Sequence, residues 1–227
     1  MGTVQGVIFD IDGTLLCSND AHARSWVDAF ADFGWEMSYF RIKWLIGMGG
    51  DKLLGTLIPS VTPEEGFGKV VSERRKKIFL EQYAPHLRAA PGSRDLVQCL
   101  KDRGLKLVIA TSAKSEELET LLEKAEVNGL FPEATTASDV QNSKPAPDVV
   151  HSALEKLGMD PQQVLMVGDT PYDIESAGKA GVGVVAVRTG GWDDDALKDA
   201  VAIYESPADI LANLDTSPFM SGAQPSQ

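Results

Sequence analysis

Two aspartates stand two residues apart directly after an apolar run near the start of the chain. The run, residues 4–9, reads VQGVIF and leads into Asp10-Ile11-Asp12-Gly13-Thr14. Such a run predicts a buried strand, and ligands of an open α/β sheet bind where its parallel strands end. There, one carboxylate can attack phosphorus, the second can move a proton, and Mg2+ can offset their mutual repulsion. The same residues also fit a plain acidic turn, so other segments have to decide between the two interpretations.

Three later segments place more polar side chains at predicted strand ends or helix starts. They contain Thr111 and Ser112 after the run 105–110, Lys144 directly before Pro145, and Asp169 and Asp173 after the run 164–167. Asp169 and Asp173 bring carboxylates to the sheet edge that also receives Asp10. Hydroxyls and free backbone N–H groups at a helix start favour a bound anion, and Lys144 adds a positive charge. Together these residue types favour a site that handles an anionic group.

The four segments, in this order, resemble the motifs of the haloacid dehalogenase superfamily of phosphoryl-transfer enzymes over residues 4–190. By this resemblance Asp10 is the nucleophile and Asp12 the general acid/base. The other roles that it implies are phosphate binding for Thr111, Ser112 and Lys144, and metal binding for Asp10, Asp12 and Asp169. Asp173 is either a supporting metal ligand or an acid that orients its neighbours. Ser112 also fits a cap of the helix that follows.

The resemblance implies a Mg2+-dependent phosphatase that hydrolyses a small phosphorylated metabolite through an aspartyl phosphate. Asp10 would attack the phosphoryl group, and Asp12 would protonate the leaving alcohol and then activate water. Mg2+ would be held by Asp10, Asp169 and the backbone carbonyl of Asp12. Dehalogenases of the superfamily lack an aspartate two residues after the nucleophile, so Asp12 favours phosphate chemistry. The implied relatives are of the phosphoglycolate phosphatase and β-phosphoglucomutase type.

Strands and helices alternate along the chain outside one long helical stretch. Strands are expected at 4–10, 105–111, 134–137, 164–169, 182–187 and 202–205. The alternation predicts an α/β fold with a doubly wound, Rossmann-like parallel sheet. Residues 17–88 show only helical patterns and are expected to form an inserted all-helical cap domain, which in the family closes over the substrate. The α/β catalytic core is then 1–16 and 89–214, and 215–227 is expected to be a disordered tail.

Polar residues of the expected cap have two interpretations each. His22-Ala23-Arg24-Ser25-Trp26 matches a spacing found in β-phosphoglucomutases, which makes His22 and Arg24 possible substrate contacts. The alternative is that both make ordinary hydrogen bonds near the hinge while Trp26 packs inside the cap. Residues 73–77, ERRKK, are expected to be a solvated helix face, with a cation that reaches the substrate as the alternative.

Two functions other than a phosphatase are considered. A sugar-phosphate mutase of the β-phosphoglucomutase type has a cap arginine after a Gly-x-Ser stretch. The comparable segment here, residues 47–52 (GMGGDK), has no arginine, although Lys43 or Lys52 could substitute. A phosphorylatable receiver module also combines acids, a hydroxyl and a lysine with Mg2+. Its phosphorylated aspartate follows a later strand and it has no helical insertion, so the position of Asp10 speaks against it.

Composition limits the partners and the location that we expect. The chain has 227 residues, 43% of them hydrophobic, and a formal net charge of -12. Without a basic patch, nucleic acid is not an expected partner. Two cysteines without metal-ligand spacing, no signal peptide and no long apolar run predict a reduced, cytoplasmic location away from membranes. The expected partner is a small phosphorylated metabolite, and the expected state is a monomer or homodimer.

Overall fold

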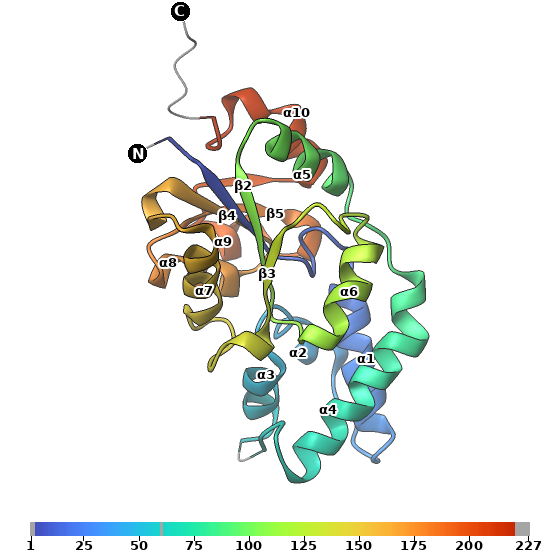
Figure 1. Ribbon diagram of the computed structural model, residues 1–227. Coiled ribbons are helices and arrows are strands. Elements are labelled where there is room, and N and C mark those ends of the chain that lie inside the picture. Colours follow the sequence, from blue (N-terminus) through green and yellow to red (C-terminus); the bar gives the residue numbers. More distant parts are fainter. Residues whose placement is uncertain (1–2, 60, 221–227) are drawn as a thin grey trace, which may run out of the picture.

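The computed structural model describes residues 3–59 and 61–220, and its centre is a six-stranded parallel sheet (Figure 1). The strands are β1 Gly6–Phe9, β2 Lys106–Ala110, β3 Glu133–Thr135, β4 Val164–Gly168, β5 Gly183–Val187 and β6 Ala202–Tyr204. Their order across the sheet is β3-β2-β1-β4-β5-β6. The winding therefore changes direction between β1 and β4, and a crevice for ligands forms at their carboxyl ends. All six strands were expected, and their ends differ from the prediction by at most two residues.

Both faces of the sheet are covered, as a doubly wound fold requires. Val7 and Phe9 of β1 belong to the hydrophobic core of one face, and Ile8 belongs to the core of the other. The first face is covered by α5 (Ser93–Asp102), α6 (Ser115–Lys124) and α10 (Pro207–Ala212), and the second by α7 (Asp148–Leu157) and α8 (Pro171–Lys179). The short helix α9, Asp194–Leu197, follows β5. The predicted α/β fold is confirmed.

The segment between β1 and α5 consists of helices with a hydrophobic core of their own. These are α1 Asn19–Ala31, α2 Tyr39–Lys43, α3 Gly50–Leu57 and α4 Gly66–Ile78, followed by a π-helical turn at Phe79–Tyr83. Their apolar faces meet around Trp26, Phe30 and Leu54. Figure 1 shows these helices together at one end of the molecule, beyond the carboxyl ends of the strands. We refer to this helical segment as the cap.

The two connections between the cap and the sheet run side by side. Leu16 and Ala89 form an antiparallel bridge, the Cys17 N–H donates to the Arg88 carbonyl at 3.0 Å, and the Ala90 N–H donates to the Leu15 carbonyl at 2.9 Å. Because Leu15 and Leu16 follow the Asp10–Asp12 loop so closely, both connections are anchored next to it. Movement of the cap would therefore pivot beside the strand end that carries the two aspartates.

The chain after α10 is more ordered than we expected. Residues 214–216 form a turn of 3-10 helix, and Phe219 is only 2% exposed within the larger core of the sheet. The predicted disordered tail is therefore wrong for residues 215–220. This stretch is rich in small and polar residues, a composition that predicts disorder. Its single aromatic residue, Phe219, packs into the core and holds the stretch there. The rest of that prediction, 221–227, lies outside the described residues.

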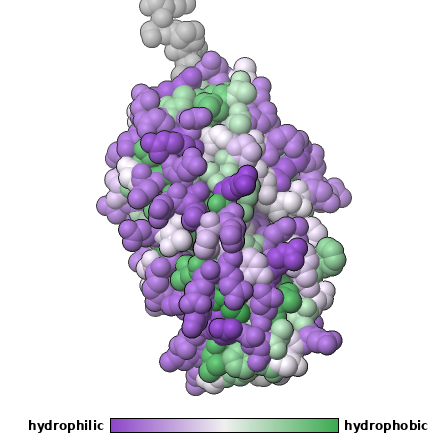
Figure 2. Space-filling model, turned by 90° about the vertical axis from the view of Figure 1, so that its right-hand side faces the viewer, coloured by the Kyte–Doolittle hydropathy of each residue, from purple (hydrophilic) through white to green (hydrophobic). Residues whose placement is uncertain are grey.

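The molecular surface is largely polar. The face shown in Figure 2 is mostly hydrophilic, with apolar patches between the polar side chains. The most exposed large apolar side chain in the described part of the chain is Phe40 of α2, at 67%. Among the described residues, no helix is both long enough and apolar enough to cross a membrane. Cys17 and Cys99 are both free thiols.

Replacement of the anchoring ring tests whether the end of the chain belongs to the core. We expect Phe219→Ala to lower the free energy of unfolding by about 3 kcal/mol, because it leaves a cavity among buried side chains. Urea unfolding followed by circular dichroism measures this change. The matched control is Phe40→Ala, which removes an exposed ring and should change stability by less than about 0.5 kcal/mol. Equal effects of the two substitutions would contradict the assignment.

Candidate active site

A buried lysine connects two strand ends and the start of a helix. The Lys144 ammonium donates to Asp10 Oδ1 at 2.7 Å, to Asp173 Oδ1 at 2.8 Å and to the Ala110 carbonyl at 2.9 Å. Lys144 is 1% exposed. Burial alone would lower the pKa of Lys144, but the carboxylates of Asp10 and Asp173 outweigh burial and raise it. Lys144 is therefore a permanent positive charge in the interior, with all three of its protons engaged.

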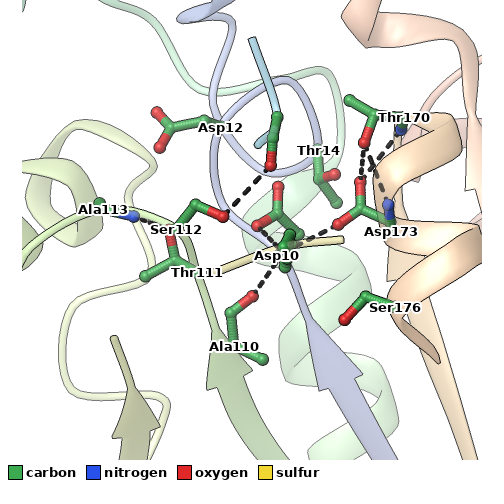
Figure 3. A network of polar contacts seen from close by, with 12 residues as sticks. Asp10, Asp12, Thr14, Ala110, Thr111, Ser112, Ala113, Thr170, Asp173 and Ser176 are labelled. Atoms are coloured by element: carbon green, nitrogen blue, oxygen red, sulfur yellow. Dashed lines mark hydrogen bonds and ion pairs between the residues drawn. The ribbon is translucent and has the colours of Figure 1, made fainter. Parts of the chain in front are cut away.

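The two carboxylates that contact this charge belong to a buried cluster of three. Asp10, Asp169 and Asp173 each offer an oxygen that lies within 4.8 Å of the others. Asp10 follows β1, Asp169 follows β4, and Asp173 lies in the first turn of α8, so the sheet edge brings them together. Figure 3 shows Asp10 and Asp173 pointing toward one another across the ends of these elements. Because one ammonium cannot neutralise three carboxylates, the cluster fits a hard cation with oxygen ligands.

The pKa values of Asp10 and Asp169 are both raised above the ordinary value of an aspartate. Burial, together with Asp173 and Asp12, raises the pKa of Asp10 to about 7 even though Lys144 opposes the shift. Burial and the charges of Asp173 and Asp10 also raise the pKa of Asp169, and hydrogen bonds from Asn19 and Thr14 only partly offset them. Without a cation, the cluster therefore holds protons that ordinary aspartates would release.

Two side chains that follow β1 in the sequence orient the Asp169 carboxylate. Thr14 Oγ1 donates to Asp169 Oδ1 at 3.0 Å, and Asn19 Nδ2 donates to Asp169 Oδ2 at 2.8 Å. A side chain at Gly13 would overlap Asp169, since a Cβ built there lies 2.1 Å from Oδ2, and the φ of Gly13 is +78°. Only glycine lets the loop pass so close to the carboxylate. Sequence reasoning missed Asn19, although its position soon after Asp10 was a usable signal.

Asp173 has little capacity left for another partner. Its Oδ1 accepts from Lys144, and its Oδ2 accepts from the Thr170 hydroxyl at 2.7 Å and from the Thr170 N–H at 3.0 Å. This is the reciprocal arrangement that starts α8, because Thr170 Oγ1 in turn accepts from the Asp173 N–H. Of the two alternatives for Asp173, the geometry favours an acid that orients Lys144 and the helix start.

The Asp12 side chain stands apart from the cluster and faces the cap. Asp12 Oδ1 accepts from Ser18 Oγ at 2.6 Å and lies 2.7 Å from Nε2 of His22. Figure 3 shows Asp12 pointing away from the Asp10–Asp173 pair. Burial would raise the pKa of Asp12, but the contacts with His22 and Ser18 and the charge of Arg75 hold it below its ordinary value. The two aspartates of the loop therefore have opposite shifts in pKa.

A chain of side chains connects Asp12 to both parts of the molecule. Arg75 of α4 contacts Nδ1 of His22, and its Nη1 donates to Glu117 of α6 at 2.9 Å. Glu117 is 3% exposed, and the His22 ring stacks on Phe79 with centroids 4.1 Å apart. Because a guanidinium only donates, the contact with Arg75 favours the arrangement in which Nδ1 accepts and Nε2 donates to Asp12.

The predicted cap contacts are partly as expected. His22 lies at the site, and Trp26 is buried in the cap core while one edge lines the cavity described below. Arg24 is exposed and stacks over Tyr39 at 5.2 Å, so the structure does not bring it to the site. Two cations from residues 73–77, Arg75 and Lys76, line the cavity, and Arg75 points inward from a face that we expected to be solvated. Glu117 gave no signal in the sequence, since an acid in the first turn of a helix is common.

A cavity of about 690 Å³ lies between the cap and the strand ends. Its walls include Asp10, Asp12, Thr111 and Ser112 from the sheet side and His22 and Arg75 from the cap. Thr111 is 1% exposed, and its Oγ1 accepts from the Ala113 N–H at 3.0 Å. Ser112 Oγ instead donates to the Gly47 carbonyl of the cap at 3.2 Å, and α6 begins only at Ser115, so Ser112 does not cap that helix. The cavity gives a small molecule access to Asp10 and Asp12 at once.

The fold and the site define an α/β enzyme with an acidic cluster at the switch point of a parallel sheet and a helical cap above it. A model of the family described as haloacid dehalogenase-like hydrolase matches residues 7–187, and the chain belongs to that family.

Known proteins with similar sequences or structures agree with this membership. Protein SUPPRESSOR OF QUENCHING 1, chloroplastic, of Arabidopsis thaliana is 29% identical over 99% of this chain, which spans only 21% of that protein's length. Probable phosphatase IndB of Dickeya dadantii is 30% identical over 86% of this chain and 85% of its own. A hydrolase from Pseudomonas syringae superposes with a TM-score of 0.87 at 29% identity, covering 93% and 98% of the two chains. A putative beta-phosphoglucomutase from Bacteroides vulgatus gives 0.83 at 26% identity, covering 94% and 88%.

The raised pKa values predict how stability depends on pH in metal-free protein. The folded-state pKa of Asp10 is about 7 against an ordinary value of 3.8, and that of Asp169 is also raised. Between those two values the native state holds protons that the unfolded chain releases, so the free energy of unfolding should fall as pH rises. The slope is at most about 1.4 kcal/mol per pH unit for each group.

Urea unfolding in EDTA at a series of pH values measures this slope. Asp10→Asn should flatten it, because the amide does not titrate. Added MgCl2 should stabilise the parent most at the upper end of the range, where the carboxylates are ionised. A parent protein that becomes more stable across this window in EDTA would contradict the assignment.

Proposed function

We propose that this protein is a phosphatase that hydrolyses monoesters of small phosphorylated metabolites with Asp10 as the nucleophile. The observation that carries the proposal is the buried cluster of Asp10, Asp169 and Asp173, two of which contact Lys144, beside a cavity whose wall includes Asp10 and Asp12. Phosphoryl transfer needs charge compensation more than any other catalytic contribution, and this arrangement concentrates it at one point.

Mg2+ is the cation that we assign to the cluster. Asp10 and Asp169, with the backbone carbonyl of Asp12, would hold it, and Asp173 would keep Lys144 in place. Carboxylate and carbonyl oxygens are the ligands that Mg2+ prefers. When bound, Mg2+ offsets the repulsion between an anionic nucleophile and an anionic phosphate.

The first half of the reaction transfers the phosphoryl group to the enzyme. Asp10 forms a bond to phosphorus while the ester oxygen leaves, and Lys144 with the Thr111 hydroxyl binds the phosphoryl oxygens. Lys144 is held beside the nucleophile by three hydrogen bonds, and it would exchange one of them for a phosphoryl oxygen. The product of this half is an aspartyl phosphate and a free alcohol.

Asp12 carries the proton in both halves. The negative charge of a bound phosphate beside Asp12 raises its pKa, so that it holds a proton for the leaving alkoxide. The ionised Asp12 then accepts a proton from the water that attacks the aspartyl phosphate, which releases inorganic phosphate. His22 and Ser18 hold the Asp12 carboxylate toward the cavity between these steps.

A sugar-phosphate mutase is the second candidate, and the similarity to the putative beta-phosphoglucomutase favours it. A mutase needs a cap cation for the second phosphate of a bisphosphate. Neither substitute that we considered lines the cavity: Lys43 pairs with Asp20 at 3.0 Å, and Lys52 lies 3.7 Å from Asp51. Three other cap cations, Lys69, Arg75 and Lys76, do line the cavity, and two of them pair with Glu117 and Glu116. We place the phosphatase first because its relative IndB is named a probable phosphatase, and we keep the mutase as the second candidate.

Removal of the nucleophile tests the proposal directly. We expect Asp10→Asn to reduce phosphate release by at least about 10³-fold with the fold intact, since an amide does not attack phosphorus. Phosphate release is measured over a panel of phosphorylated metabolites with Mg2+ and with EDTA, and β-glucose 1-phosphate is also assayed for isomerisation. The control Asp95→Asn changes an exposed aspartate of α5 and should leave turnover unchanged. Normal release by Asp10→Asn would overturn the mechanism.

Asp12→Ala separates the two half-reactions. Without a base for the water, the aspartyl phosphate should accumulate and steady-state turnover should fall by about 10² to 10⁴-fold. Rapid quenching followed by intact-protein mass spectrometry detects the phosphorylated chain. Ser18→Ala keeps the carboxylate and removes one of its hydrogen bonds, so its effect should be much smaller. Kinetics of Asp12→Ala that match the parent would assign the proton transfer to another acid.

A further inference from the structure

The loop after β5, residues 188–192, forms one wall of the acidic cluster. Gly190 packs so closely on Asp169 that a Cβ built there would lie 1.8 Å from Oδ2, which excludes any side chain. The Gly190 carbonyl accepts from Asn19 Nδ2 at 3.4 Å, and the same amide donates to Asp169. Thr189 Oγ1 donates to the Gly13 carbonyl at 2.5 Å. The position of this loop is therefore mechanically linked to the position of Asp169.

The same loop ends in an aromatic contact with the cap. The Trp192 ring lies 4.7 Å from the ring of Trp44, which directly follows α2, with an angle of 58° between their planes. Tyr172 of α8 meets Trp192 edge-on at 6.2 Å, and its hydroxyl donates to the Trp44 carbonyl at 2.6 Å. We call Trp44, Tyr172 and Trp192 the aromatic clasp. It joins the cap to the wall of the cluster, two residues beyond Gly190.

The rings of the aromatic clasp lie at the protein surface, where they can separate as well as pack. Trp44 is 42% exposed, and Tyr172 and Trp192 are partly exposed, so separation of the rings leaves no buried cavity. Two other contacts between the cap and the strand ends reach different loops: Ser112 donates to the Gly47 carbonyl, and the Gly49 N–H lies 3.4 Å from the Lys144 carbonyl. Asn19, at the start of α1, contacts Asp169 and Gly190 directly, so the clasp is a second connection from the cap to this wall of the cluster.

We infer that Trp192 is a positioning residue that couples closure of the cap to the placement of Asp169, and that the cap thereby tunes the affinity of the acidic cluster for a divalent cation. The inference rests on the proposed function, since it assigns a metal to that cluster. A closed cap holds Trp192 against Trp44, which keeps Gly190 and Asn19 against Asp169. An open cap releases the loop and loosens one ligand of the metal.

Mg2+ affinity of tryptophan variants tests the coupling, because Trp44 touches none of the three carboxylates. Isothermal titration of Mg2+ alone into the full chain gives the dissociation constant. We expect Trp44→Ala and Trp192→Ala each to weaken binding by about two- to tenfold, the range that one aromatic pair provides. The double variant should bind no more weakly than the worse single variant, since both break one contact. Trp192→Phe, which retains a ring, should keep most of the parent affinity.

The matched control is Trp35→Ala. Trp35 is a cap tryptophan with 43% exposure that stacks on Phe67, and its ring contact lies within the cap. It should leave the Mg2+ affinity unchanged. Parent affinity in Trp44→Ala, or equal losses in Trp44→Ala and Trp35→Ala, would overturn the coupling.

Failure of the proposed function gives a different pattern of results. If clasp variants weaken Mg2+ binding but the parent releases phosphate from no ester, the coupling holds and the phosphatase assignment fails. If phosphate release depends on Mg2+ while Trp44→Ala binds the metal like the parent, the function holds and the coupling fails. A parent that binds no Mg2+ overturns both.

Discussion

One buried ammonium holds the site together. Lys144 lies in the interior with hydrogen bonds to two carboxylates and one carbonyl, and a charge so far from water persists only with such partners. Together with Asp169, its carboxylate partners leave an excess of negative charge, which a bound cation would neutralise. The ends of β1 and β4 and the start of α8 each bring a carboxylate to this point. Gly13 lets its loop pass close to Asp169.

Asp10 and Asp12 lie in different surroundings, which suits them to different steps of the proposed reaction. Both follow β1, but Asp10 faces the other carboxylates and Asp12 faces the cap, so their pKa values shift in opposite directions. The proposed nucleophile and the proposed acid/base need different surroundings, and one residue between them is enough to reach both. The cap supplies His22 and Arg75, so the environment of Asp12 exists only where the cap meets the sheet.

The cap is attached at several points with different consequences. Arg75 and Glu117 connect it to the Asp12 side of the cavity, Gly47 contacts Ser112, and the aromatic clasp reaches the loop beside Asp169. Each contact joins a cap helix or turn to a different strand-end loop. A single rigid-body movement of the cap would therefore alter all sides of the site together, which is how a lid can coordinate access with chemistry.

The sequence by itself determined the order of strands and helices, the helical insertion and the segments that form the acidic cluster. Those features are local: apolar runs specify strands, and carboxylates directly after parallel strands must meet at one edge. Only the tertiary structure decided that Arg75 turns inward, that Glu117 partners it, that Arg24 stays exposed and that Phe219 anchors the end of the chain. Their neighbours come from distant segments, and a charged residue on a helix carries no local mark of the surface that it will face.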